Sequence, residues 1–111
     1  MPLAPAALFG PEPINSTTET LLTVAANGQS IIKRAVFTNT HTAVVTLSVY
    51  VVRSGGSAGA TNLMIDAYPL SSGQAYVSPE LANCVLDAGD TLQAVASVAD
   101  KILALGSGYS L

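Results

Sequence analysis

The side chains that could support catalysis are few, and they lie far apart along the chain. His41 is the only histidine and Cys84 the only cysteine among 111 residues. His41 stands in the polar turn 39–42, where a solvated side chain is the ordinary role, and no base lies near Cys84 in the sequence. One histidine and one cysteine cannot supply the three or four ligands of a zinc site, and no G-x-S-x-G motif is present to place a serine nucleophile. We therefore predict no catalytic residue, no metal site and no bound cofactor, and hence no enzyme.

The acidic and glycine-rich segments fit structural roles. Asp87 and Asp90 flank Gly89 in a turn, where Asp side chains commonly accept hydrogen bonds from local backbone amides. A calcium site at this turn would need further oxygen ligands, to which the sequence does not point. The glycine-rich stretch 55–59 lacks the Gly-Lys-Ser/Thr ending of a phosphate-binding loop. We interpret the first segment as a tight turn and the second as a flexible loop.

The composition indicates a chain that packs against other chains. Apolar residues make up 50% of the sequence and charged residues 10%, whereas soluble domains average about 25% charged residues. The four basic residues are scattered and the net charge is −3, so no basic patch for nucleic acid is expected. No apolar run approaches the roughly 20 residues of a membrane span. A homo-oligomer is predicted, with a neutral monomer as the alternative.

Hydrophobic alternation with a period of two dominates the chain from residue 16 onward. The clearest example is the stretch 43–53, whose apolar residues are Val45, Leu47, Val49 and Val51. A second example is 91–98, whose apolar set is Leu92, Ala94, Ala96 and Val98. Turn signals such as Asn27-Gly28 separate these stretches. About eight short strands without any helical period predict an all-β protein, a single β-sandwich with a jelly-roll-like topology. The predicted strands are 17–24, 30–39, 43–53, 63–69, 75–78, 83–86, 91–98 and 101–105, with 109–111 extending the last.

The first residues differ from the rest, because four of the six prolines stand at positions 2, 5, 11 and 13. Proline lacks an amide donor and biases the preceding residue toward extended backbone. The sequence therefore predicts an extended N-terminal arm over residues 1–15, neither helix nor central strand, and a sandwich domain over 16–111. We expect the apolar side chains of the arm to bind a neighbouring subunit, with folding back over its own domain as the alternative. These side chains are Leu3, Leu8, Phe9 and Ile14.

Three segments resemble the small β-sandwich structural proteins of tailed-phage virions, of the capsid cement or decoration type. They are the turn and strand within 23–40, the strand and loop VTLSVYVVRSGGSA at 45–58, and the segment LDAGDTLQAVAS at 86–97. The resemblance covers about residues 23–106 and leaves out the arm.

The resemblance implies a virion protein that is made in the host cytoplasm and binds the outer shell, usually as a trimer at local threefold positions. Its implied partners are the phage major capsid protein or other virion proteins, and it carries no catalytic residues. The alternatives are a neck, tail or fibre component with the same fold, or a carbohydrate-binding module. The last would need an exposed aromatic row, for which Tyr50, Tyr68 and Tyr76 are the candidates.

Overall fold

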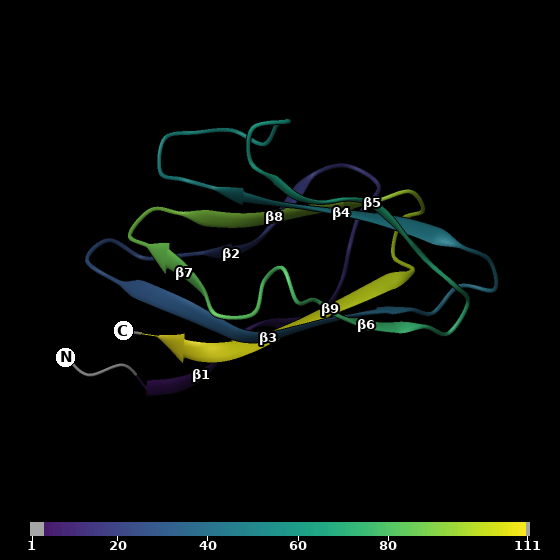
Figure 1. Ribbon diagram of the computed structural model, residues 1–111, viewed down its shortest axis with the longest axis horizontal. Coiled ribbons are helices and arrows are strands. Elements are labelled where there is room, and N and C mark those ends of the chain that lie inside the picture. Colours follow the sequence, from purple (N-terminus) through teal and green to yellow (C-terminus); the bar gives the residue numbers. More distant parts are fainter. Residues whose placement is uncertain (1–3, 111) are drawn as a thin grey trace.

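The computed structural model describes residues 4–110, which form nine strands in two antiparallel sheets packed face to face (Figure 1). No helix in this part of the chain is long and apolar enough to cross a membrane. The prediction of an all-β sandwich is confirmed. The strands are β1 (Ala4–Pro13), β2 (Glu19–Thr23), β3 (Gln29–Asn39), β4 (Val45–Val52), β5 (Leu63–Leu70), β6 (Ala75–Val77), β7 (Cys84–Asp87), β8 (Thr91–Ala96) and β9 (Ile102–Ser110).

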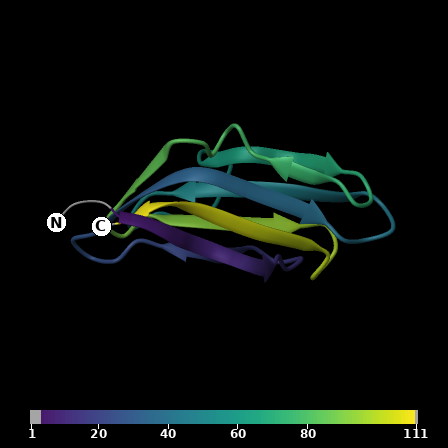
Figure 2. The same ribbon diagram turned by 90° about the horizontal axis from the view of Figure 1, so that it is seen from below.

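The strand order is that of a jelly roll. Sheet A has the order β1-β9-β3-β6, with the short strand β7 also paired to β3, and sheet B has the order β2-β8-β4-β5. Apart from the β4–β5 and β6–β7 connections, every link between consecutive strands crosses from one sheet to the other. Viewed from below, β1 lies beside β9 and β9 beside β3 (Figure 2). The strand order therefore agrees with the predicted jelly-roll-like topology, in which most neighbouring strands are distant in sequence.

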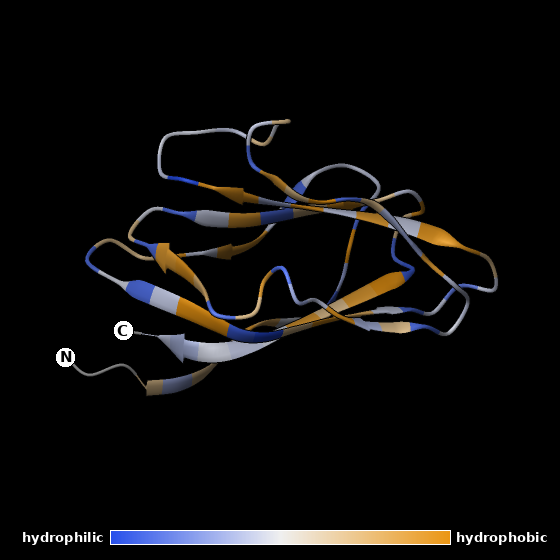
Figure 3. Cartoon of the chain, viewed as in Figure 1, coloured by the Kyte–Doolittle hydropathy of each residue, from blue (hydrophilic) through white to orange (hydrophobic). Residues whose placement is uncertain are grey.

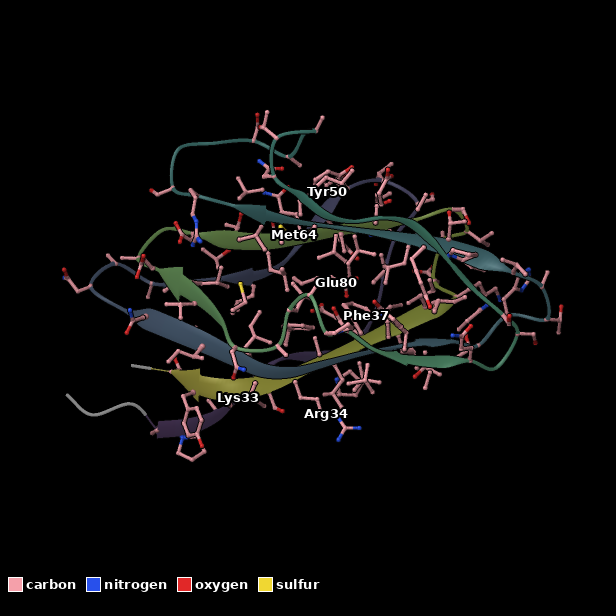
Figure 4. All side chains as sticks on the ribbon, viewed as in Figure 1. Lys33, Arg34, Phe37, Tyr50, Met64 and Glu80 are labelled. Atoms are coloured by element: carbon pink, nitrogen blue, oxygen red, sulfur yellow. The ribbon has the colours of Figure 1, made fainter. Side chains whose placement is uncertain are left out.

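The core forms where the inward side chains of both sheets meet. The four apolar residues predicted for the inner face of the stretch 43–53 are at most 9% exposed, and Leu92, Ala94 and Ala96 of β8 are buried as predicted. Phe37 of β3 is fully buried opposite them, between the sheets (Figure 4). Val98 is only partly buried, at the margin of this cluster. The period-two pattern therefore identified the buried face of β4 and β8 correctly.

Two turns have the geometry that their residues favour. Asn27 has a φ of 64°, and the Gly28 amide donates to the Ala25 carbonyl at 2.9 Å. At the turn between β3 and β4, the buried Asn39 donates through Nδ2 to the carbonyl oxygens of Ala43 and Leu70. Asn39 thereby joins the β3–β4 turn to the end of β5 and holds both sheets together at this end of the molecule.

The N-terminal segment corrects one prediction. Residues 4–13 are the strand β1, which pairs antiparallel with β9 at the edge of sheet A. The segment is not a central strand, as predicted, but the prediction that it stays outside the sandwich is wrong. An edge strand needs amide donors on one side only, so it tolerates prolines that a central strand would not.

The side chains predicted to bind a neighbour lie mostly inside the molecule. Phe9 and Ile14 are buried in the core, and Leu8 is partly buried against it, while Leu3 is outside the described residues. The ring of Phe9 covers Gly106 of β9 so closely that a Cβ atom at position 106 would overlap it. Phe9 and Ile14 therefore stabilise their own domain, which is the alternative that the sequence had left open.

Candidate interaction surface

The outward side of sheet A carries an apolar surface, which we call the A face. It consists of seven apolar residues and three charged residues that lie between or beside them. The charged residues are Lys33, Arg34 and Asp87. Five of the seven are between 38% and 50% exposed, and Ile31 and Val36 are half-buried between them. The seven apolar residues are Ile31, Val36, Val77, Val85, Leu103, Leu105 and Tyr109.

Strand register arranges these side chains in rows across the sheet. Ile31 pairs with Tyr109 on one side and with Val85 on the other. Farther along β3, Val36 pairs with Leu105 and Val77 in the same way. Side chains opposite one another on neighbouring strands are in contact range, so each row forms a continuous apolar strip over β9, β3 and the short strands β7 or β6.

A bulge in β3 places two cations between these rows. The register against β9 shifts between Ile32 and Arg34, and Lys33 and Arg34 are consecutive exposed residues instead of alternating ones. Both side chains point away from sheet B (Figure 4). Lys33 Nζ donates to Asn83 Oδ1. Arg34 has no ion pair within residues 4–110, where the one ion pair joins Arg53 to Asp90. Because Arg34 lies among apolar side chains and has no ion pair within residues 4–110, its guanidinium group is suited to form an ion pair with a carboxylate of another molecule.

The outward side of sheet B, which we call the B face, has a different chemistry. On β4 and β8 it consists of half-buried residues that alternate with the buried core positions. Hydroxyl and amide side chains predominate among them, and none is a lysine or an arginine. In Figure 3, apolar residues are orange on the first half of β9 in sheet A and also on β4. On β4 the apolar residues are at the buried core positions, whereas on β9 they also include the exposed Leu103 and Leu105. The B-face residues of these two strands are Thr46, Ser48, Tyr50, Thr91, Gln93 and Val95.

The residues considered for catalysis lie apart in the structure. His41 is in the β3–β4 turn, where its amide donates to Asn39 Oδ1, whereas Cys84 pairs with Ile32 toward the other end of β3. Burial raises the pKa of the Cys84 thiol and so lowers its nucleophilicity at neutral pH. Within residues 4–110, no group of three or more His, Cys, Asp or Glu side chains is placed to hold a metal ion.

Asp90 has the structural role expected from its turn. Its carboxylate accepts hydrogen bonds from the amides of Asp87 and Ser54, at 2.8 and 2.9 Å, and from Arg53 Nη1 at 2.7 Å. Burial by itself raises the pKa of Asp90, but these hydrogen bonds and the Arg53 charge outweigh burial and hold the pKa below its usual value. Asp90 thus fastens the β7–β8 turn to the end of β4 and is not free to bind a ligand.

The three tyrosines do not form a row. Tyr50 lies on the outer side of sheet B (Figure 4). Tyr68 and Tyr76 stack on each other with ring centroids 4.3 Å apart, and Tyr76 Oη donates to Glu80 Oε1 at 2.6 Å. Burial and this hydrogen bond raise the pKa of Tyr76. Because the stacked rings each cover one face of the other, they offer no extended platform for a sugar.

A hollow of about 230 Å³ opens between β1 and β2, at the edge where the two sheets separate. Its lining combines apolar side chains, such as Leu8 and Leu22, with hydroxyl-bearing residues. The latter are Thr23, Ser30 and Ser110. No lining side chain carries a charge, so the hollow offers no group for acid–base chemistry.

The sequence contained a signal for the A face that period-two reasoning did not use. In β9, Ile102 and Ala104 are buried, while Leu103 and Leu105 between them are exposed. A strand that is apolar on both sides is typical of one covered on both sides. The unbroken apolar run ILAL at 102–105 is therefore the sequence signal that corresponds to the exposed apolar side chains of the A face.

Comparison with solved structures identifies similar folds in chains of infectious bursal disease virus. A chain in the structure of infectious bursal disease virus Gx strain superimposes with a TM-score of 0.52 and 17% identity, over 98% of this chain and 30% of that chain. A chain of the Gt strain gives a TM-score of 0.48 and 15% identity, over 97% and 32%. This protein thus spans about a third of the length of the chains it matches, and at this identity the likeness concerns the fold. No protein-family model and no curated protein matches the sequence.

Proposed function

We propose that this chain is a non-enzymatic structural subunit of a virus particle and, more specifically, a capsid cement or decoration protein of a tailed phage. In this proposal the protein acts by packing against other proteins of the particle and catalyses no reaction. The protein bridges neighbouring shell subunits and removes apolar surface from water, which stabilises the shell against the outward pressure of packed DNA.

The A face is the observation that carries this proposal. The A face has five exposed large apolar side chains and two cations, Lys33 and Arg34, that form no ion pair within residues 4–110. In a chain with 10% charged residues, such a face is suited to a contact with another protein. Apolar burial contributes about 25 cal/mol per Å², and many copies on one particle add their weak contacts. The jelly-roll fold and the resemblance to phage decoration proteins support the same reading.

The partners in this proposal are the phage major capsid protein or other virion proteins. A neck, tail or fibre component with the same fold is the nearest alternative, because the A face would serve equally well in those assemblies. The carbohydrate-binding alternative receives no support from the tyrosines, since two of the three stack on each other. The proposal includes neither nucleic acid nor membrane as a partner.

Particles that lack the gene for this chain provide the test. Purified, gold-labelled protein is added to them, and we expect it to bind the shell in a regular pattern and to raise the temperature at which particles release their DNA. Label at the neck, tail or fibres would favour the alternative. Particles that bind no label anywhere, and are no more heat-stable with the protein than without it, would contradict a structural role.

A matched pair of variants tests whether the A face is the surface that binds the particle. Leu105→Ser removes an exposed apolar side chain from the A face, and Val95→Ser makes a similar change on the B face. We expect Leu105→Ser to lower retention on particles and Val95→Ser to leave retention unchanged. Equal retention of both variants would mean that the A face is not the contact.

A further inference from the structure

We propose that one half of the A face, from Asp87 to Arg34, binds the same half of a second copy of this chain, so that two molecules pair about a twofold axis. The inference rests on the proposed function only in assuming that the pair forms within a virus particle. The pairing itself is a property of the isolated chain and is measurable without any particle.

Three successive rows across sheet A make up this half. Gln29 pairs with Asp87 in the first row, Ile31 pairs with Tyr109 and Val85 in the second, and Arg34 pairs with Ser107 in the third. Asp87 and Val85 are exposed while Leu86 between them is buried, so the Asp87 carboxylate is on the same outer side as Val85. An apolar row therefore lies between an acidic row and a basic row.

This order of rows is complementary to itself under one symmetry operation. A twofold axis that runs across the strands at the Ile31 row reverses the row order of the second copy. Arg34 of each copy then lies opposite Gln29 of the other, and Asp87, which accepts a hydrogen bond from Gln29 Nε2, is beside it on β7, one strand spacing away. A strand spacing is about 4.8 Å, which the long Arg34 side chain can span, so two ion pairs form and the apolar row packs on its counterpart. Such an arrangement has the apolar centre and charged margin of known protein interfaces.

Charge excludes the neighbouring registers. An axis at the Arg34 row would bring Lys33 and Arg34 of both copies together, and like charges that are brought into contact cost several kcal/mol. An axis along the strands would also place the basic row opposite itself. Only the axis at the Ile31 row gives Arg34, which has no ion pair within residues 4–110, a carboxylate partner.

The contact is small, because it uses about half of one sheet face. Its area falls below the roughly 800 Å² per partner of a standard interface, so the pair is a weak one. Many copies held close together on a particle raise the effective concentration and increase the paired fraction. The Leu105 row lies outside this contact and stays free to meet another protein.

Sedimentation equilibrium of the purified full chain, from the micromolar to the millimolar range, tests the pairing. We expect a monomer–dimer equilibrium that weakens as salt is added, because salt screens the two ion pairs. Arg34→Glu and Asp87→Arg should each weaken association at least about tenfold, since each opposes like charges at two symmetric places. The double variant Arg34→Glu with Asp87→Arg has the net charge of the wild type and should regain most of the association.

Three further variants control this experiment. Asp66→Arg makes the same charge change on the exposed part of β5, and Leu105→Ser lies outside the contact, so both should dimerise as the wild type does. Tyr109→Ser removes apolar surface at the centre of the contact and should weaken the dimer while its melting temperature stays close to the wild-type value.

The inference is overturned by a strict monomer at millimolar concentration, by a trimer, or by a dimer that Arg34→Glu leaves intact. It is equally overturned if the double variant stays as weak as the single ones. A dimer that behaves as expected but does not bind particles supports the pairing and contradicts the proposed function. Binding to particles by a strictly monomeric chain supports the proposed function and contradicts the pairing.

Discussion

The two outer faces of the sandwich differ in the chemistry of their side chains. On sheet A, Leu103 and Leu105 of β9 are exposed, and the exposed cations Lys33 and Arg34 lie on β3 beside them. On sheet B, the corresponding positions of β4 and β8 hold mainly hydroxyl and amide side chains.

This difference between the outer faces has no cause in the hydrophobic core of the fold. The inner faces of both sheets are apolar because they form one core, so the core explains neither outer face. On β4 and β8, the B face follows the ordinary pattern of a sheet with one side in water. The A face departs from that pattern, which makes it the candidate interaction surface of the molecule.

The largest expected effect concerns the strand that borders sheet A. Deleting residues 2–13 removes β1 and the buried Phe9 and leaves β9 as an unprotected edge. Burying a Phe side chain contributes about 1.5–3 kcal/mol, and the backbone pairing with β9 is lost as well. We expect the melting temperature, measured by circular dichroism, to fall by at least about 10 °C.

Pro5→Ala, an exposed change in the same strand, is the control for the deletion and should melt close to the wild type. A truncated chain that also melts like the wild type would show that the segment contributes nothing to the domain. It would restore the interpretation of this segment as an arm outside the sandwich.

The second effect contrasts the two sides of one strand in sheet B. Leu47 is fully buried, so Leu47→Ala should lower the free energy of unfolding by about 2–5 kcal/mol. Its neighbour Thr46 lies on the B face, and Thr46→Ala should change the free energy by no more than about 0.5 kcal/mol. Urea denaturation of both variants measures the difference. A larger loss in Thr46→Ala than in Leu47→Ala would mean that β4 faces the opposite way.

The third effect concerns the polar contact that joins the end of β4 to the turn before β8. Asp90→Asn leaves a buried hydrogen-bond donor without its acceptor and should cost about 1–3 kcal/mol at neutral pH. The Arg53 side chain is 63% exposed, so most of this loss comes from the amides of Asp87 and Ser54 and little from the ion pair.

The same variant has a defined pH dependence. Since the pKa of Asp90 is lower in the folded chain than its ordinary value, its stabilising contribution is present above the unfolded pKa and is lost as the pH falls through the folded pKa. The stability difference between wild type and Asp90→Asn should therefore be constant near neutrality and shrink below about pH 4. A difference that persists unchanged in acid would mean that ionisation of Asp90 does not contribute.

The smallest effect on stability sharpens the comparison between the two faces. Leu105→Ser and Val95→Ser are surface changes on the A face and the B face, and each should alter the free energy of unfolding by no more than about 0.5 kcal/mol. Denaturant titration checks this equality. A large loss in Leu105→Ser alone would mean that the A face supports the fold, and its apolar character would then need no partner.

Much of the fold could be predicted from the sequence, because strand periodicity is a local property. The alternation in 43–53 and 91–98 established which side chains of β4 and β8 are buried, and Asn27-Gly28 located a turn. These patterns depend only on side chains two residues apart and on backbone preferences of single residues. The all-β class and the absence of a helical period followed in the same way.

Tertiary structure decided the parts that depend on distant pairing. Prolines excluded the N-terminal segment from the centre of a sheet, but only the register of β1 against β9, about a hundred residues away, made it an edge strand. The middle of β9, residues 106–108, was missed for a related reason. Gly106 and Gly108 are poor strand formers on their own, and they are needed here because Phe9 and the Ile31 carbonyl lie where their side chains would be.

The interaction surface shows the same division. A charge-poor chain with an apolar run at 102–105 and the adjacent cations Lys33 and Arg34 can be recognised without the structure. Only the folded sheet placed Leu105, Val36 and Val77 in one row and brought Asp87 to the same side as Arg34. The physical reason is that strand pairing joins segments by backbone hydrogen bonds, which carry no side-chain code, so the neighbours on a sheet face are set by topology and register.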